Sequence, residues 1–300
     1  MKSREFFNAD NAPEDPILQE ERERLAGNRI TKREKVSEME ARLDRFNFDI
    51  LEQMFKERLQ KTGIPVAEAN VLRRDRISNL NHPLVGLGGY NTSTNEILIG
   101  FTNFRNYASR NNTDRYFTFA EILIHEENHA VSKTRCWNLK KENNEPLSTQ
   151  SGYSFNVSAP DESGAYEGVG RVFNLFNEGV TEINALDMTE EYLRRTGDLD
   201  KKKFTYLRQV TEHGVYSKAI EIVQAFTKRL AGANGVSKDT AWDTIMRGYF
   251  EGEDILREDF KEWFGEILPP GFMDKLMRAD DEEMTKLLEE LEQTPLKKAA

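Results

Sequence analysis

The sequence has one cysteine and four histidines among its 300 residues. Cys136 is alone, so no intrachain disulfide can form, which fits a reducing compartment. No apolar run approaches the ~18 residues that a membrane-spanning helix needs. Met1–Glu5 is followed by polar and acidic residues rather than by the apolar segment of a signal peptide. These absences predict a cytoplasmic protein that does not enter a membrane.

Positive charge is also in deficit. The net charge is −10, and the isoelectric point is near 5.2. This balance argues against nucleic acids and anionic membranes as main partners. Charged residues make up 31% of the chain and gather at its ends. We therefore expect a charged, mobile or loosely helical arm over residues 1–40, one domain over 41–280, and a charged helix and tail over 281–300.

Histidine is scarce, yet two of the four histidines fall within one short motif. Residues 125–129 read His-Glu-Glu-Asn-His, an H-E-x-x-H pattern. On a helix, positions i and i+4 share a face, so His125 and His129 can bind one metal ion. Glu126 lies about 100° further round the helix, where it can accept a proton from a water that the metal activates. This spacing is typical of zinc-dependent peptidases.

The residues before the motif predict a helix that carries it. Thr118 and Glu121 have the spacing of a capping box, with Thr118 as the N-cap. No proline or glycine interrupts the following residues as far as Lys133. We expect a helix over about residues 119–133.

Catalytic zinc usually has three protein ligands and a water, so the motif needs a third ligand. The extended motif with a glycine and a third histidine is absent, because Ser132 and Arg135 occupy those positions. His82 and His213 lie at no recognisable spacing. A carboxylate from a second helix is the other known solution, and Glu178 is the best candidate.

The sequence resembles the gluzincin group of metallopeptidases in two motifs. One is the H-E-x-x-H motif, and the other is Asn177-Glu178-Gly179 followed by Val-Thr-Glu182. The resemblance covers about residues 88–184. It implies that Glu178, on a second helix over about 171–187, is the third zinc ligand. It also implies that Glu182 bonds a zinc histidine, where thermolysin-like enzymes carry an aspartate that is one methylene shorter. A solvated acidic helix face is the alternative for this pair of glutamates.

Strands are expected on both sides of the H-E-x-x-H helix. The turn-rich residues 86–95 followed by Glu96–Ile99 predict a hairpin. In gluzincins an edge strand beside the zinc helix binds extended peptide, although Glu96–Ile99 could equally be an ordinary buried strand. Residues 151–155 indicate a second hairpin.

The remaining sequence predicts a helical body. Apolar spacing indicates a helix from about Glu40 and another over His213–Leu230, with further helices over about 240–250, 255–267 and 282–292. The expected class is α+β with helix dominant: a zincin-like core followed by a helical C-terminal part. An oxyanion needs another donor, for which we favour His213 or Tyr216 over Tyr206.

The pattern as a whole predicts a zinc-dependent peptidase acting on a peptide or protein substrate. His125, His129 and Glu178 would bind Zn²⁺, and Glu126 would be the general base. Two alternatives stay open: an inactive zincin fold used for binding or scaffolding, and a structural helical protein with an accidental motif.

Overall fold

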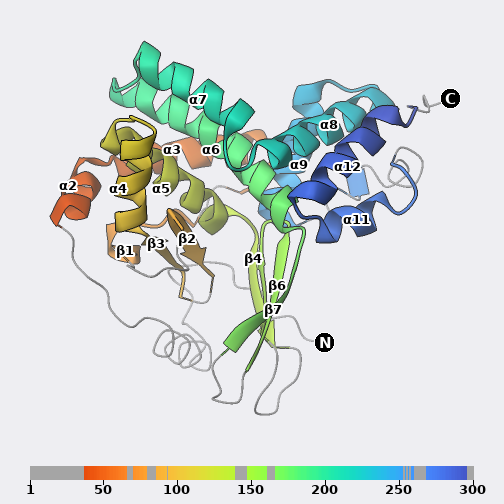
Figure 1. The fold of residues 1–300 in the computed structure, drawn as a ribbon, viewed down its shortest axis with the longest axis horizontal. Coiled ribbons are helices and arrows are strands. Elements are labelled where there is room, and N and C mark those ends of the chain that lie inside the picture. Colours follow the sequence, from red (N-terminus) through yellow and green to blue (C-terminus); the bar gives the residue numbers. More distant parts are fainter. Residues whose placement is uncertain are drawn as a thin grey trace.

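Helices dominate the computed structural model, and two small sheets complete it, which confirms the helix-dominated α+β class (Figure 1). The structure describes residues 37–65, 70–79, 86–92, 94–138, 147–160, 166–252 and 268–295, with isolated positions between 253 and 267. His82 and most of the proposed N-terminal arm lie outside these residues.

The described chain begins with two short helices, α2 (Ser37–Arg45) and α3 (Phe48–Lys61). The prediction of one continuous helix from about Glu40 is therefore wrong. Asn47 separates the two helices because its side chain accepts a hydrogen bond from the backbone N–H of Ile50 and so caps α3.

The first sheet has three strands, β1 (Ile77–Asn79), β2 (Gly88–Asn91) and β3 (Glu96–Ile99), after the short 3₁₀ helix η2 (Arg74–Arg76). Strands β2 and β3 pair antiparallel, which confirms the first hairpin. The strand order is β1-β3-β2, and β1 runs parallel to β3. Strand β3 is thus the buried central strand, and β2, rather than Glu96–Ile99, is the edge strand beside the motif helix.

Helix α4 (Phe101–Arg110) leads into α5 (Arg115–Val131), which carries the H-E-x-x-H motif. The capping box predicted at Thr118 is wrong. Asp114 caps the helix instead, with its carboxylate accepting from the backbone N–H of Phe117 at 2.8 Å. Thr118 is fully buried within the first turns and bonds to the Thr113 hydroxyl. Helix α5 is buried on nearly all sides, so it lies at the centre of the molecule.

The second sheet is an antiparallel meander between the two motif-bearing helices. Its strands are β4 (Thr134–Asn138), β5 (Leu147–Ser151), β6 (Ser154–Pro160) and β7 (Tyr166–Val172). The predicted hairpin at residues 151–155 is confirmed, and Gly152 turns it with a φ of +56°. The sheet extends away from the helices (Figure 1). Helix α6 (Asn174–Thr196) follows and packs against α5.

The rest of the described chain is helical. It contains α7 (Lys201–His213), α8 (Ser217–Asn234), α9 (Lys238–Glu251), α11 (Phe272–Arg278) and α12 (Asp281–Gln293). The helices predicted near residues 240–250 and 282–292 are confirmed. The helix predicted over His213–Leu230 is wrong at its start, because His213 ends α7 and α8 begins at Ser217. The helix predicted over 255–267 falls mostly outside the described residues.

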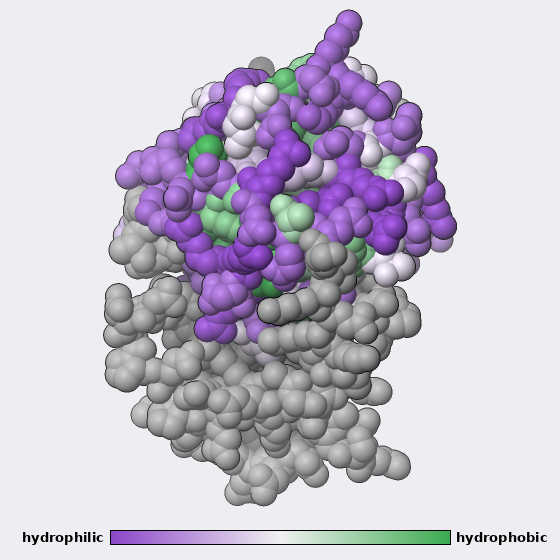
Figure 2. All heavy atoms as spheres, turned by 90° about the vertical axis from the view of Figure 1, so that its left-hand side faces the viewer, coloured by the Kyte–Doolittle hydropathy of each residue, from purple (hydrophilic) through white to green (hydrophobic). Residues whose placement is uncertain are grey.

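The hydrophobic core runs without a break from α2 and α3 through α5 and α6 to α12. Figure 2 shows the side that carries α2 and α4, where hydrophilic residues cover most of the described surface and apolar patches are small. None of the described helices combines the length and the apolar character that crossing a bilayer requires.

Candidate metal centre

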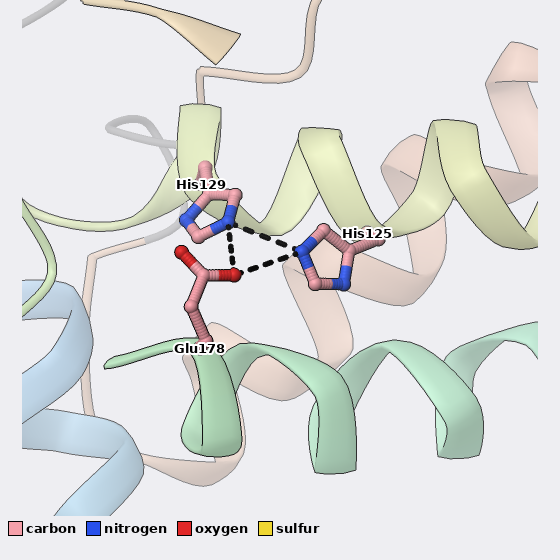
Figure 3. Close-up of side chains that lie close together, drawn as sticks. All are labelled: His125, His129 and Glu178. Atoms are coloured by element: carbon pink, nitrogen blue, oxygen red, sulfur yellow. Dashed lines mark hydrogen bonds and ion pairs between the residues drawn. The ribbon is translucent and has the colours of Figure 1, made fainter. Parts of the chain in front are cut away.

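Helices α5 and α6 bring three metal-ligating side chains together. His125 and His129 lie one turn apart on α5, and Glu178 faces them from α6 (Figure 3). His125 Nε2 lies 3.3 Å and His129 Nε2 lies 3.5 Å from the same oxygen of Glu178. The two Nε2 atoms are 3.3 Å apart. Two imidazole nitrogens and a carboxylate oxygen that converge in this way could hold a metal ion.

The three side chains lie in a largely dry environment that couples their charges strongly. Between 11% and 15% of each side chain is exposed. Burial disfavours the charged form of His125 and also that of Glu178. The carboxylates of Glu178 and Glu182 outweigh burial at His125 and hold its pKa well above the usual range. Burial likewise acts against ionisation of Glu178, yet the two histidines lower its pKa. A cation between these groups would be compensated by a carboxylate that is already ionised.

Glu182 bonds the second ring nitrogen of His125. Its carboxylate accepts from Nδ1 at 2.7 Å, so Nε2 is the nitrogen turned toward Glu178. An outer carboxylate of this kind fixes the tautomer and the ring orientation of a metal-binding histidine. The extra methylene of glutamate compared with aspartate does not prevent this contact.

His129 has a different neighbour, Asn177, to which the sequence pattern gave no role of its own. Asn177 Nδ2 lies 3.5 Å from His129 Nδ1, and Asn177 Oδ1 accepts from the backbone N–H of Tyr153 at 2.8 Å. The turn of the second sheet therefore holds Asn177 against the ring. The signal in the sequence was its place directly before Glu178.

The glycine that follows Glu178 has a packing role. A Cβ added at Gly179 would lie 2.4 Å from the backbone carbonyl oxygen of Ala219 on α8. Only glycine allows α8 to approach α6 this closely. Tyr216, at the N-cap of α8, is thereby brought to the ligands.

Tyr216 lies directly against His125. Its ring stacks on that of His125, with centroids 5.7 Å apart and planes 10° from parallel. Burial and then the charges of Glu178, Glu126 and Glu182 raise the pKa of Tyr216, so the hydroxyl keeps its proton.

The two other candidate oxyanion donors are placed differently. The Tyr206 hydroxyl lies 2.8 Å from that of Tyr107 on α4, and its ring packs edge-on against Phe117. Tyr206 therefore contributes to packing behind the ligands. His213 is the last residue of α7, and its side chain lies outside the part of the chain that the structure describes.

Glu126 lies beside His125, His129 and Glu178 and is not part of the converging group. It is buried, and burial raises its pKa above the usual range, although His125 and His129 act in the opposite direction. The backbone N–H of Tyr90 in β2 donates to its carboxylate. A Cβ added at Gly88 would lie 2.8 Å from Glu126 Oε1, so the edge strand needs glycine at this position.

Two further carboxylates of α5, those of Glu121 and Glu127, are buried, and their burial was not anticipated. Burial, together with the charge of Glu182, raises the pKa of Glu121 to about 8. One Glu121 oxygen has no hydrogen-bond partner among the described residues. Glu127, also buried, accepts from the backbone N–H of Leu72 at 3.0 Å, and burial raises its pKa well above the usual range. Glu121 precedes His125 by one helical turn, which is the signal that could have drawn attention to it.

Within the part of the chain that the structure describes, His125, His129 and Glu178 are the one group of three such side chains with converging ligand atoms. The backbone of Cys136 lies in β4, and its side chain is not among those described. Comparison with models of known protein families, with curated proteins and with solved structures finds no match to this chain. The gluzincin resemblance therefore depends on the motif residues, and it stays a prediction.

Proposed function

We propose that the protein is a zinc-dependent peptidase with a gluzincin-like, zincin-type core. The observation that carries the proposal is the convergence of His125, His129 and Glu178 from two helices onto one point. Two histidines and a glutamate form one of the ligand sets that catalytic zinc uses.

The spacing of the candidate ligand atoms is compatible with tetrahedral coordination of zinc. Bonds of about 2.0–2.1 Å at tetrahedral angles leave ligand atoms roughly 3.3–3.4 Å apart. The three separations here are 3.3, 3.3 and 3.5 Å. Octahedral angles at the same bond lengths would bring neighbouring ligands to about 2.9 Å, which fits less well.

The chain's own residues then have separate roles. Bound zinc would activate a water molecule and polarise the scissile carbonyl group. Glu126 would accept the proton of that water and deliver it to the leaving amine, a role that suits a buried carboxylate whose pKa is raised above its usual range. Tyr216 keeps its proton and lies against His125 and Glu178, so it is our candidate donor to the oxyanion. Glu182 would hold His125 by accepting from its Nδ1, while Asn177 lies against the ring of His129.

The edge strand suggests how a peptide would be held. Strand β2 lies at the edge of its sheet and packs against α5. An extended peptide can pair with such an edge through main-chain hydrogen bonds. Gly88 contacts the Glu126 side chain, so a bound peptide would run close to the proposed base.

The decisive experiment compares the wild-type protein with Glu126→Gln in metal content and in digestion of a peptide library. We expect about one zinc per chain in both proteins. Glutamine cannot accept the proton, so turnover should fall by ~10²- to 10⁴-fold.

The outcomes separate the three interpretations of the sequence. Full zinc and full activity in Glu126→Gln would show that another group is the base. Zinc without cleavage in the wild type would favour a binding or scaffolding protein. Wild-type protein that takes up no metal would contradict the peptidase proposal and leave a structural protein.

A further inference from the structure

A buried pair of amides joins the two ligand-bearing helices. Asn184 of α6 donates from Nδ2 to Oδ1 of Asn128 on α5. Asn128 in turn donates from Nδ2 to the backbone carbonyl of Ile124 at 2.7 Å. Both side chains are fully buried. Asn128 lies between His125 and His129 in the chain, and Asn184 follows Glu182 by two residues.

A third helix contributes a charge to this pair. Arg58 of α3 donates from Nη1 to Asn184 Oδ1 at 2.6 Å. Burial lowers the pKa of Arg58, while the nearby carboxylates of Asp187 and Glu191 oppose that effect. A charge is buried only where it is well partnered. The hydrogen bonds therefore run in one line from Arg58 through both asparagines to the carbonyl directly before His125.

These hydrogen bonds restrict the distance between α5 and α6 and their relative rotation more tightly than apolar contacts would. The surrounding core is apolar, and leucine at either asparagine position could fill similar space. An amide pair satisfies its donors and acceptors only at one separation and one relative rotation of the two helices. Buried polar groups can thus favour one packing arrangement over nearby alternatives.

We propose that Arg58, Asn128 and Asn184 form an amide clamp that sets the spacing of α5 and α6 and thereby positions the metal ligands. The clamp acts as a positioning device and touches neither metal nor substrate. The inference rests on the proposed function only in taking His125, His129 and Glu178 as the metal ligands. It predicts that loss of the clamp weakens metal binding even where the fold is intact.

The test measures zinc affinity by chelator competition and the visible absorption of the Co²⁺-loaded protein, which reports the geometry of the ligands. Asn184→Leu removes the central member of the clamp. Asn184→Gln is the mild variant, because it keeps the amide but displaces it by one methylene. The triple variant replaces all three clamp residues at once: Arg58→Met, Asn128→Leu and Asn184→Leu. None of the three then leaves a hydrogen-bond partner unpaired in the clamp. Replacing both partners of a buried hydrogen bond by apolar groups of similar shape is often nearly neutral for stability. Affinities are compared where each metal-free variant is fully folded by circular dichroism.

A matched control lies toward the C-terminal end of α8, the end opposite Tyr216. Arg229 of α8 is also buried, and it donates to the backbone carbonyls of Leu291 and Thr294 at 2.8 Å. Arg229→Met should lower stability and leave zinc affinity unchanged.

We expect a 10- to 100-fold loss of zinc affinity and an altered Co²⁺ spectrum in Asn184→Leu and in the triple variant, the range typical of partners that orient metal ligands. Asn184→Gln should give a smaller loss in the same direction. Wild-type affinity and spectrum in all three variants would overturn the clamp. Equal losses in Arg229→Met would also overturn it, because the effect would then follow stability alone.

Failure of the proposed function gives different results. A wild-type protein that binds zinc tightly but cleaves no peptide contradicts the peptidase proposal and leaves the clamp standing. A wild-type protein that binds no metal contradicts both.

Discussion

At the scale of single residues, His125 is the most constrained side chain of the centre. Its Nδ1 bonds Glu182 at 2.7 Å, its Nε2 lies 3.3 Å from Glu178, and one face of its ring is covered by Tyr216. Each contact restricts the rotation of the imidazole ring before any metal binds, so less conformational entropy would be lost on binding. The ring is therefore preorganised for one ligand geometry.

Glu182→Ala tests the outer contact to His125. Without the carboxylate, the imidazole can rotate and exchange its tautomers, so zinc affinity should fall roughly 10- to 100-fold while the site persists. Chelator competition measures the affinity, and elemental analysis checks that about one zinc per chain still binds at saturation. Glu190→Ala is a suitable control, because Glu190 lies further along α6 in an exposed pair with Arg194. Equal affinity in wild type and Glu182→Ala would show that the contact between Glu182 and His125 does not orient a metal ligand.

At the scale of secondary-structure elements, the contact between β2 and α5 decides where Glu126 lies. The strand approaches the helix so closely that a Cβ at Gly88 would lie 2.9 Å from both Ile122 Cγ2 and Glu126 Cγ. The N–H of Tyr90, two residues along the same strand, bonds the same carboxylate. Strand β2 therefore acts on the proposed base in two ways: Gly88 leaves room for the Glu126 side chain, and Tyr90 donates a hydrogen bond to its carboxylate.

Gly88→Ala should therefore impair catalysis selectively. The added methyl group has to push the Glu126 side chain or the strand aside, and a displacement of about 1 Å can cost ~10²-fold in rate. Zinc affinity should stay near that of the wild type, because the three ligands lie on α5 and α6. The rate is measured on whichever peptide the library identifies, with zinc content measured in parallel.

The adjacent glycine provides the matched control. A Cβ at Gly89 would meet no atom within 4 Å, so Gly89→Ala should keep zinc and the position of Glu126, and its rate should fall less than that of Gly88→Ala. Equal rates in the two alanine variants would show that the close approach of β2 does not position Glu126.

Local patterns in the sequence predicted most of the ligand arrangement. The i, i+4 spacing of His125 and His129 fixed their common face because helical periodicity is a local property. Glu178 was found through its motif, and the structure places it opposite both histidines. The helix start was missed, because Thr118 and Asp114 are both capable caps and tertiary burial of Thr118 decided between them.

Other features depend on pairings between distant residues. Strand β3 is central because β1, some twenty residues earlier in the chain, pairs with it in parallel, and no local pattern reports that. The bond from Asn184 to Asn128 spans 56 residues. Nothing in the sequence around either asparagine distinguishes it from other polar residues. The two meet only because α5 and α6 pack together, so their spacing in the sequence could not predict the clamp.

At the scale of the whole molecule, the candidate metal centre lies at the junction of elements from both halves of the chain. Helix α5 carries two of the candidate ligands, α6 carries the third, and Tyr216 comes from the loop before α8. Helices α5 and α6 are both central to the single hydrophobic core. Binding a metal there would tie together the elements that must separate when the protein unfolds.

Removal of the metal should therefore lower the stability of the entire domain. A ligand that binds only the folded state adds about 4 kcal/mol when its free concentration is ~1,000 times its dissociation constant. For a domain of this size, that corresponds to a loss on the order of 10 °C in Tm after treatment with a chelator and its removal. Calorimetry of the zinc-loaded and zinc-free protein measures the difference, and adding zinc back should restore it.

His125→Ala and His129→Ala supply the control, since each removes one of two ligands that α5 provides. Both should bind no zinc at stoichiometric concentration, and their Tm should not respond to chelator or to added zinc. Because metal binding and folding are coupled, each variant should resemble the zinc-free wild type in stability. A Tm that responds to zinc equally in the wild type and in both variants would place the stabilising metal somewhere other than between these helices.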